Sequence, residues 1–217
     1  MLKWAMFLIK SKPMKIMFII MLVLFYSVPP SYSQTAESYS EKGVDKFLKG
    51  DYQGAIQDFN NAIDLSPKYA EAYEARAGAK IGLGQYKEAI LDYNKAIELN
   101  PNLSTAYIGR GKAKDGLGDY MGAVQDYNNA IKVDPNDSLA YVGIALAKGN
   151  MGDYKGAIEN FDKAIELNPK SEEAYYNRGV AKILSGQKDS GCSDLSKAGQ
   201  LGYVEANGDI KRFCINK

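Results

Sequence analysis

Few residues in this chain could carry out catalysis. The 217 residues include no histidine, which removes the most common general base, the usual metal ligand and every nucleophile that depends on histidine. No glycine-rich phosphate-binding or dinucleotide-binding motif is present either. Acid pairs such as Asp51 and Asp58 leave a carboxylate-based hydrolase as the least favoured interpretation. We expect a non-catalytic protein that binds no cofactor and no metal.

The two cysteines, Cys192 and Cys214, could form a disulfide. They lie eleven residues before and eleven residues after Tyr203, which we place near the turn between two antiparallel helices. Positions symmetric about such a turn end up side by side. An oxidising compartment would favour the disulfide, and a pair of buried thiols is the alternative.

The sequence repeats with a period of 34 residues, and the predicted secondary-structure elements follow this period. The segment GQYKEAILDYNKAIELNP at 84–101 has close copies 34 residues upstream and 34 and 68 residues downstream, without insertion or deletion. A fixed period of this length is typical of stacked repeats. We predict five repeats without linkers, at 36–69, 70–103, 104–137, 138–171 and 172–205.

Each repeat is predicted to be a hairpin of two helices, called helix A and helix B. In the second repeat, apolar residues recur at helical spacing after Gly84 until Asn100 and Pro101 end helix B. One hairpin cannot bury its apolar stripe alone, so neighbouring hairpins must stack. Small residues on helix A and aromatic residues on helix B recur with the period, at Gly43, Ala77, Gly111, Ala145 and Gly179, and at Phe59, Tyr93, Tyr127 and Phe161.

This pattern resembles the tetratricopeptide repeat (TPR) family. Its characteristic positions in the second repeat are Tyr73, Ala77, Gly84, Tyr86, Ala89, Tyr93, Ala96 and Pro101. The resemblance covers residues 36 to about 205. It implies an all-α fold, a right-handed α-solenoid of five hairpins, with a concave groove lined by helix A that holds a protein or peptide. Residues 206–217 follow as a C-terminal capping helix with one apolar face.

The resemblance also implies which residues line the partner-binding groove. They are Glu74, Gly78, Ile81, Ile108, Lys112, Val142, Leu146, Tyr176, Asn177, Val180 and Ile183. A floor of glycine and alanine would let the backbone of a ligand come close to the helices. A repeat array can also tolerate glycines in its helices, at about 1 kcal/mol each. The sequence favours neither interpretation.

Two charged positions change together along the repeats. Helix A carries Lys42, Arg76, Arg110, Ile144 and Arg178, and helix B carries Asp58, Asp92, Asp126, Asn160 and Asp194. The fourth repeat therefore lacks both the cation and the anion. We predict that the two positions form partly buried ion pairs within each repeat, supported by a row of lysines one turn further along helix A.

Residues 1–33 are unlike the repeats. The apolar run at 16–28 follows several lysines and precedes a proline pair and small residues, which is typical of a signal peptide cleaved after Ser33. This run of thirteen residues is shorter than the roughly 20 apolar residues that span a bilayer, so an uncleaved N-terminal membrane anchor is the less favoured alternative. Translation could also start at Met14.

Charge and function follow from this arrangement. Removing residues 1–33 removes four lysines and no acid, which changes the formal net charge from +1 to −3. A weakly acidic chain without a basic stripe argues against nucleic acid as a partner. We expect an exported bacterial scaffold, periplasmic or at the cell surface, that binds a protein or peptide. Self-assembly into a homo-oligomer, through the groove or through Phe47 and Leu48, is the alternative.

Overall fold

The structure, a computed structural model, describes residues 35–215. The predicted signal peptide and residues 216–217 lie outside the described residues. Every regular element between residues 35 and 215 is helical. In this part of the chain no helix combines the length and the apolar character needed to cross a membrane.

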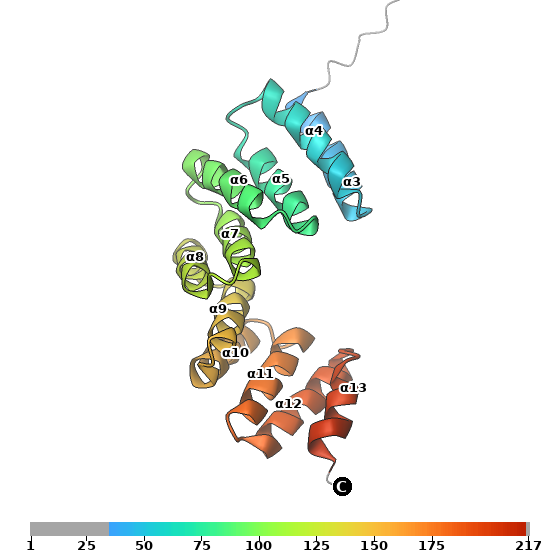
Figure 1. Cartoon of the computed structure of the whole chain (residues 1–217), viewed down its shortest axis with the longest axis vertical. Coiled ribbons are helices and arrows are strands. Elements are labelled where there is room, and N and C mark those ends of the chain that lie inside the picture. Colours follow the sequence, from blue (N-terminus) through green and yellow to red (C-terminus); the bar gives the residue numbers. More distant parts are fainter. Residues whose placement is uncertain (1–34, 216–217) are drawn as a thin grey trace, which may run out of the picture. The chain divides into compact units, whose positions relative to one another are not determined.

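Ten of the described helices form five consecutive hairpins, one for each predicted repeat (Figure 1). The A and B helices are, in order, α3 (Ala36–Leu48) and α4 (Tyr52–Leu65), α5 (Ala70–Gly82) and α6 (Tyr86–Leu99), α7 (Ser104–Gly116) and α8 (Tyr120–Val133), α9 (Ser138–Asn150) and α10 (Tyr154–Leu167), and α11 (Glu172–Leu184) and α12 (Lys188–Leu201). Each of these helices packs against the next one in the chain, and the A helices of adjacent repeats also meet. The all-α solenoid of five hairpins predicted from the sequence is confirmed.

The turn inside each hairpin depends on a glycine. In all five repeats a glycine between helix A and helix B has a left-handed backbone, with φ between 72° and 88°, which is strained for any residue with a side chain. Helix B starts two residues later. In the third repeat the side chain of Asp119 caps it by accepting a hydrogen bond of 3.0 Å from the N–H of Gly122.

The core lies between hairpins as well as within them. The alanines that recur on helix B are fully buried. Tyr127 shows why small residues are needed around its ring: a Cβ added at Gly111 on α7 or at Gly143 on α9 would lie 2.7 Å or 2.5 Å from it. One aromatic ring of helix B therefore packs between the A helix of its own repeat and the A helix of the next.

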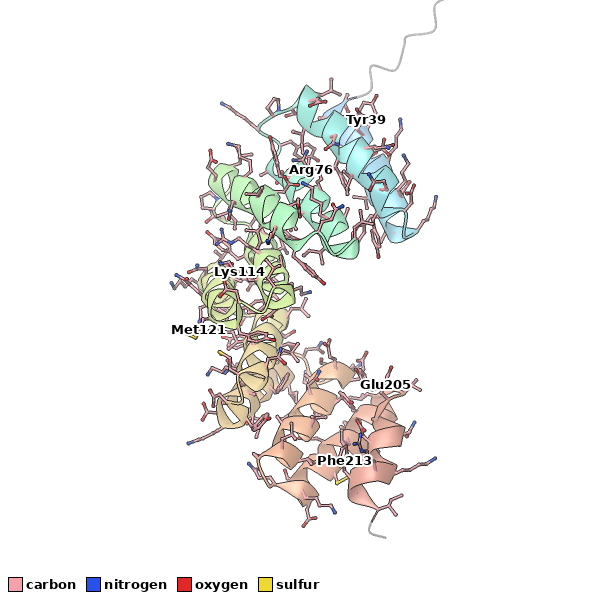
Figure 2. The ribbon with its side chains drawn as sticks, viewed as in Figure 1. Tyr39, Arg76, Lys114, Met121, Glu205 and Phe213 are labelled. Atoms are coloured by element: carbon pink, nitrogen blue, oxygen red, sulfur yellow. A yellow bond between two sulfur atoms is a disulfide. The ribbon has the colours of Figure 1, made fainter. Side chains whose placement is uncertain are left out.

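The C-terminal cap differs in shape from the single helix predicted over 206–217. It consists of a short helix, α13 (Ala206–Asp209), and a π-helical turn, η1 (Ile210–Cys214), and both pack on α12. We refer to α13 and η1 together as the cap. A disulfide joins Cys192 on α12 to Cys214, with Cα atoms 5.7 Å apart (Figure 2). This is the pairing that the sequence suggested.

Candidate partner-binding site

The predicted ion pairs are present in the second, third and fifth repeats. In the third, Arg110 donates to both carboxylate oxygens of Asp126, at 2.9 Å from Nε and 2.6 Å from Nη2. The ammonium of Lys114 lies 2.8 Å from the same carboxylate, which belongs to a residue that is 1% exposed. Arg76 and Lys80 hold Asp92 in the same way, and Figure 2 shows Arg76 and Lys114 in successive repeats. We call these groups the charge layer.

Each of these arginines also reaches back to the preceding repeat, a contact that was not predicted from the sequence. The Nη1 atom of Arg110 donates to Asn94 on α6 at 2.7 Å. The equivalent bonds run from Arg76 to Asn60 and from Arg178 to Asp162, at 2.6 Å each. The partner stands 16 residues before the arginine in every case, a spacing that superimposing the repeats on one another could have suggested. The guanidinium therefore joins two hairpins.

The first and fourth repeats depart from this arrangement. In the first repeat the carboxylate of Asp58 pairs with Lys46 at 2.7 Å, so the expected pairing with Lys42 is wrong. Lys42 lies instead over the ring of Tyr39, 5.3 Å from its centroid. In the fourth repeat Ile144 is buried in the apolar core. The charged groups are thus satisfied within the array and do not form an open ligand site.

The cap covers one of the predicted groove residues. The ring of Tyr176 stacks on Tyr203, with centroids 4.4 Å apart, and its hydroxyl donates to Asp209 of α13 at 2.7 Å. This hydrogen bond, together with burial, raises the pKa of Tyr176 to about 12. At the fifth repeat the chain itself therefore occupies this part of the predicted groove.

Raising the pH should loosen the cap. The pKa of tyrosine in an unfolded chain is about 10, and the neutral hydroxyl is the form that can donate to Asp209. Because the pKa of Tyr176 is higher in the folded state, its stabilising effect is complete below about pH 10 and is lost as the pH rises through about 12. Near-ultraviolet circular dichroism of the Tyr176–Tyr203 stack would follow this change. A Tyr176→Phe variant should lack this transition; an identical alkaline transition in the variant would contradict the assignment.

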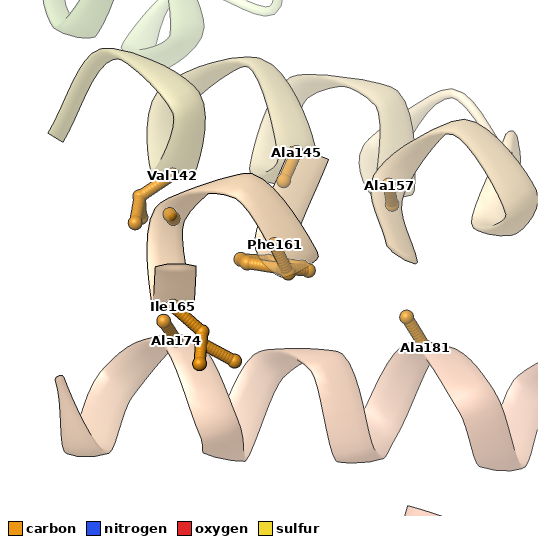
Figure 3. Packing of buried hydrophobic residues seen from close by; sticks show 8 residues of the cluster. Val142, Ala145, Ala157, Phe161, Ile165, Ala174 and Ala181 are labelled. Atoms are coloured by element: carbon orange, nitrogen blue, oxygen red, sulfur yellow. The ribbon is translucent and has the colours of Figure 1, made fainter. Parts of the chain in front are cut away.

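Two predicted groove residues are core residues. Ile108 is 5% exposed and packs with Tyr127 and Ile144, and Val142 is 6% exposed and packs with Phe161 (Figure 3). Both belong to helix A, but they face the neighbouring helices, where a partner cannot reach them. Their assignment to the groove wall is therefore wrong.

Ile81 and Ile183 also contribute to packing inside the array. Ile81 lies against the cluster that contains Tyr93, and a Cβ added at Gly191 of α12 would lie 2.6 Å from the Cγ1 atom of Ile183.

The glycines of the predicted floor have a packing role. A Cβ added at Gly109 would collide with the ring of Tyr93, as one at Gly143 would with Tyr127. These glycines let adjacent hairpins approach each other, which differs from both roles that the sequence left open. Gly78 is less crowded, because its added Cβ would meet Phe47 at 3.8 Å.

A cavity of about 360 Å³ lies between α9, α10 and α11. Three predicted groove residues, Leu146, Asn177 and Val180, line it. The other lining residues are Ala145, Gly149, Asn150, Tyr154, Ala157, Phe161, Ala181 and Leu184. Figure 3 shows Phe161 between Ala145 and Ala157 on one side and α11 on the other. We call this the joint cavity, because it lies where the fourth and fifth repeats meet.

The joint cavity exists because the fourth repeat lacks a side chain that the others have. Gly149 occupies the repeat position that is filled in the other four by Phe47, Ile81, Asp115 and Ile183. A Cβ added at Gly149 would meet only the Cβ of Ala157, at 4.0 Å. Gly149 was not among the predicted site residues, although superimposing the five repeats on one another shows the exceptional glycine.

Two other predicted groove residues lie away from the joint cavity. Lys112 is exposed, and Glu74 is half-buried on α5. Burial raises the pKa of the Glu74 carboxyl, and a hydrogen bond with Thr105 opposes this shift. Within residues 35–215, no group of histidine, cysteine or acidic side chains is arranged to hold a metal ion.

Stacked helical hairpins with a recess where two repeats meet define a helical-repeat protein of the kind used as a binding scaffold. A family profile described as "TPR repeat" matches residues 45–82, 79–114 and 150–186, and one described as "Tetratricopeptide repeat" matches residues 104–137. The chain belongs to the tetratricopeptide repeat family. Members of this family are generally non-catalytic protein-binding scaffolds.

Several solved structures share the fold. A crystal structure of MamA is similar over 76% of this chain and 96% of its own, with 25% sequence identity and a TM-score of 0.65. A tetratricopeptide repeat protein from Parabacteroides merdae is similar over 84% of this chain and 73% of its own, with 23% identity and a TM-score of 0.71. YrrB, described as a TPR protein with an unusual peptide-binding site, is similar over 83% of this chain and 94% of its own, with 20% identity and a TM-score of 0.62. No curated protein sequence matches the chain.

Proposed function

We propose that this protein is an exported, non-catalytic adapter that binds a protein partner on the A-helix surface around the joint cavity. The observation that carries the proposal is the cavity itself, an open recess of about 360 Å³ whose lining mixes apolar side chains with the uncharged polar groups of Asn150, Asn177 and Tyr154. Pockets that bury a ligand group are commonly of this size and character. The partly exposed side chains beside it, Leu146 and Val180, belong to the residues that the family resemblance assigned to partner binding.

Other prominent chemical features already have a role inside the fold. The charge layer pairs its own carboxylates, and the disulfide holds the cap. The unusual peptide-binding site described for YrrB belongs to that protein, and it supports the idea that this fold can hold a peptide. Export rests on the signal-peptide pattern at 1–33, and we propose the bacterial cell envelope as the location.

A selection of peptides displayed on phage, with the full chain as bait, would test this function. Val180→Glu should abolish capture of the selected peptides, because it places a charge beside a cavity that has no charged residue in its lining. Val44→Glu is the matched control: Val44 holds the same repeat position in α3, is 42% exposed and lies far from the joint cavity in the chain. If no peptide is selected, or if both variants capture the same peptides, the proposed function as a peptide-binding adapter at this surface would be rejected.

Self-assembly through the first repeat has less support. Where the next A helix has the alanines Ala75 and Ala79, α3 carries Glu41 and Asp45, and both acidic residues are exposed. Of the predicted apolar rim, Leu48 is exposed, but Phe47 is half-buried and packs edge-on against Tyr52 with centroids 5.4 Å apart. A polar outer face is what the terminal repeat of an array needs to stay soluble.

A further inference from the structure

We propose that the joint cavity binds one large uncharged apolar side chain of the partner, of the size of phenylalanine or isoleucine, and that Gly149 determines this selectivity. The inference rests on the proposed function, since it names the part of a partner that the same site accepts. Three observations lead to it.

The first observation is what occupies the equivalent place in other repeats. At the joint of the first and second repeats, Phe47 packs against Tyr52 and approaches Gly78. At the joint of the second and third repeats, Ile81 joins the cluster of Tyr86 and Tyr93. The first two repeats thus fill this recess with Phe47 and Ile81. In the third repeat Asp115 takes the place and accepts a hydrogen bond from the hydroxyl of Tyr127, a donor that the fourth repeat lacks because it has Phe161 there.

The second observation is that the fourth repeat keeps the walls of the recess and omits its occupant. Tyr154 and Phe161 supply the aromatic wall from α10, and α11 supplies Val180 and Leu184. Gly149 leaves the space between them empty. A side chain provided by another molecule would meet the same kind of surface that Phe47 and Ile81 meet within this chain.

The third observation is the absence of charge from the lining. None of the residues that line the joint cavity is acidic or basic. A charged side chain would lose its hydration there without gaining a partner, whereas an apolar one would be favoured by burial. Asn150, Asn177 and Tyr154 contribute polar groups to the lining, but all of these groups are uncharged, so a charged side chain would still find no partner of opposite charge there.

The test uses small model compounds in place of the unidentified partner. N-acetyl-phenylalanine methylamide and N-acetyl-isoleucine methylamide would be titrated into the isotope-labelled full chain, with N-acetyl-aspartate methylamide as the charged control. We expect the first two compounds to cause saturable NMR shifts at Leu146, Val180 and Leu184, and the aspartate compound to cause none. Absence of saturable shifts at these residues, or equal shifts with the aspartate compound, would overturn the proposal.

Two substitutions at one position show whether the empty space is responsible. Gly149→Ile should fill the cavity and weaken binding of both apolar compounds by about tenfold or more, the effect expected for losing the burial of a few methylene groups. Gly149→Ala makes the same change from glycine in a helix but leaves most of the space open, so it should bind nearly as well as the unchanged chain. Equal binding by the isoleucine and alanine variants would reject a role for Gly149.

These outcomes separate the two proposals. Displayed peptides that depend on Val180 but tolerate Gly149→Ile would retain the proposed function and reject the side-chain pocket. Saturable binding of the model compounds, lost in Gly149→Ile, would support the pocket even if no displayed peptide were selected. Circular dichroism and thermal unfolding of each variant would show that lost binding does not reflect lost folding.

Discussion

Replacing Asp126 with alanine is expected to lower the free energy of unfolding by about 3 kcal/mol, near the lower end of the range for breaking a buried ion pair. The substitution leaves Arg110 and Lys114 beside a cavity with no carboxylate, although each cation retains contact with water at 17% and 21% side-chain exposure. Arg110 would keep its hydrogen bond to Asn94 and its position over the ring of Tyr107. Urea unfolding followed by circular dichroism would measure the loss.

The fourth repeat supplies a control for this experiment. It carries Ile144 and Asn160 at the positions of Arg110 and Asp126, and Lys148 there lies 3.9 Å from the capping residue Asp153. A double variant, Arg110→Ile with Asp126→Asn, should therefore be clearly more stable than the Asp126→Asn single variant. If the double variant loses as much stability as the two single variants added together, the charge layer does not act as a coupled unit.

Removing the disulfide should have the second large effect. Cys192 and Cys214 are 22 residues apart in sequence, and the chain-entropy model gives about 3 kcal/mol for a loop of this size. The cap is otherwise held by few groups, chiefly the buried Ala206 and the contacts of Tyr176 with Tyr203 and Asp209. We expect the Cys192→Ala, Cys214→Ala double variant to unfold at lower urea concentration than the oxidised chain.

The residues at which hydrogen exchange becomes faster show whether the disulfide stabilises only the C-terminal end of the array or the whole array. In a repeat array each hairpin contacts only its neighbours, so faster amide hydrogen exchange should be confined to α11, α12 and the cap. The first three repeats should exchange as before. Reduction of the unchanged chain should reproduce the variant, and equal stability of oxidised and reduced chains would show that the bond contributes nothing to folding.

In the charge layer, the contacts within one hairpin could be predicted from the sequence, but the contacts between hairpins could not. The pairing of Arg110 with Asp126 was predictable because both groups lie within one hairpin, where the period and the joint loss in the fourth repeat link them. The bond from Arg110 to Asn94 crosses to the preceding hairpin. This bond depends on the distance between the two hairpins, and the packing of the side chains between them determines that distance. In the first repeat this packing also decided between Lys42 and Lys46 as the partner of Asp58.

At the candidate site, the sequence predicted which helix carries each residue but not whether the residue is accessible. Membership of helix A was predictable for Ile108, Val142, Leu146 and Val180, and yet the first two are buried while the last two lie by the joint cavity. The family pattern assigns a residue to a helix face but does not say how much of that face the neighbouring hairpin covers. Here the coverage depends on the rings of Tyr127 and Phe161 and on the missing side chain at Gly149.

The sequence by itself determined the five hairpins and their turns, and it indicated that the two cysteines would lie close enough to pair. These features depend on local periodicity, on the backbone freedom of glycine and on short distances along the chain. Only the tertiary structure decided which helix A residues are accessible, where two repeats leave a cavity, and how the cap covers Tyr176. Each of these depends on contacts between residues of different hairpins, and such contacts are fixed by the volumes of all the side chains that meet there.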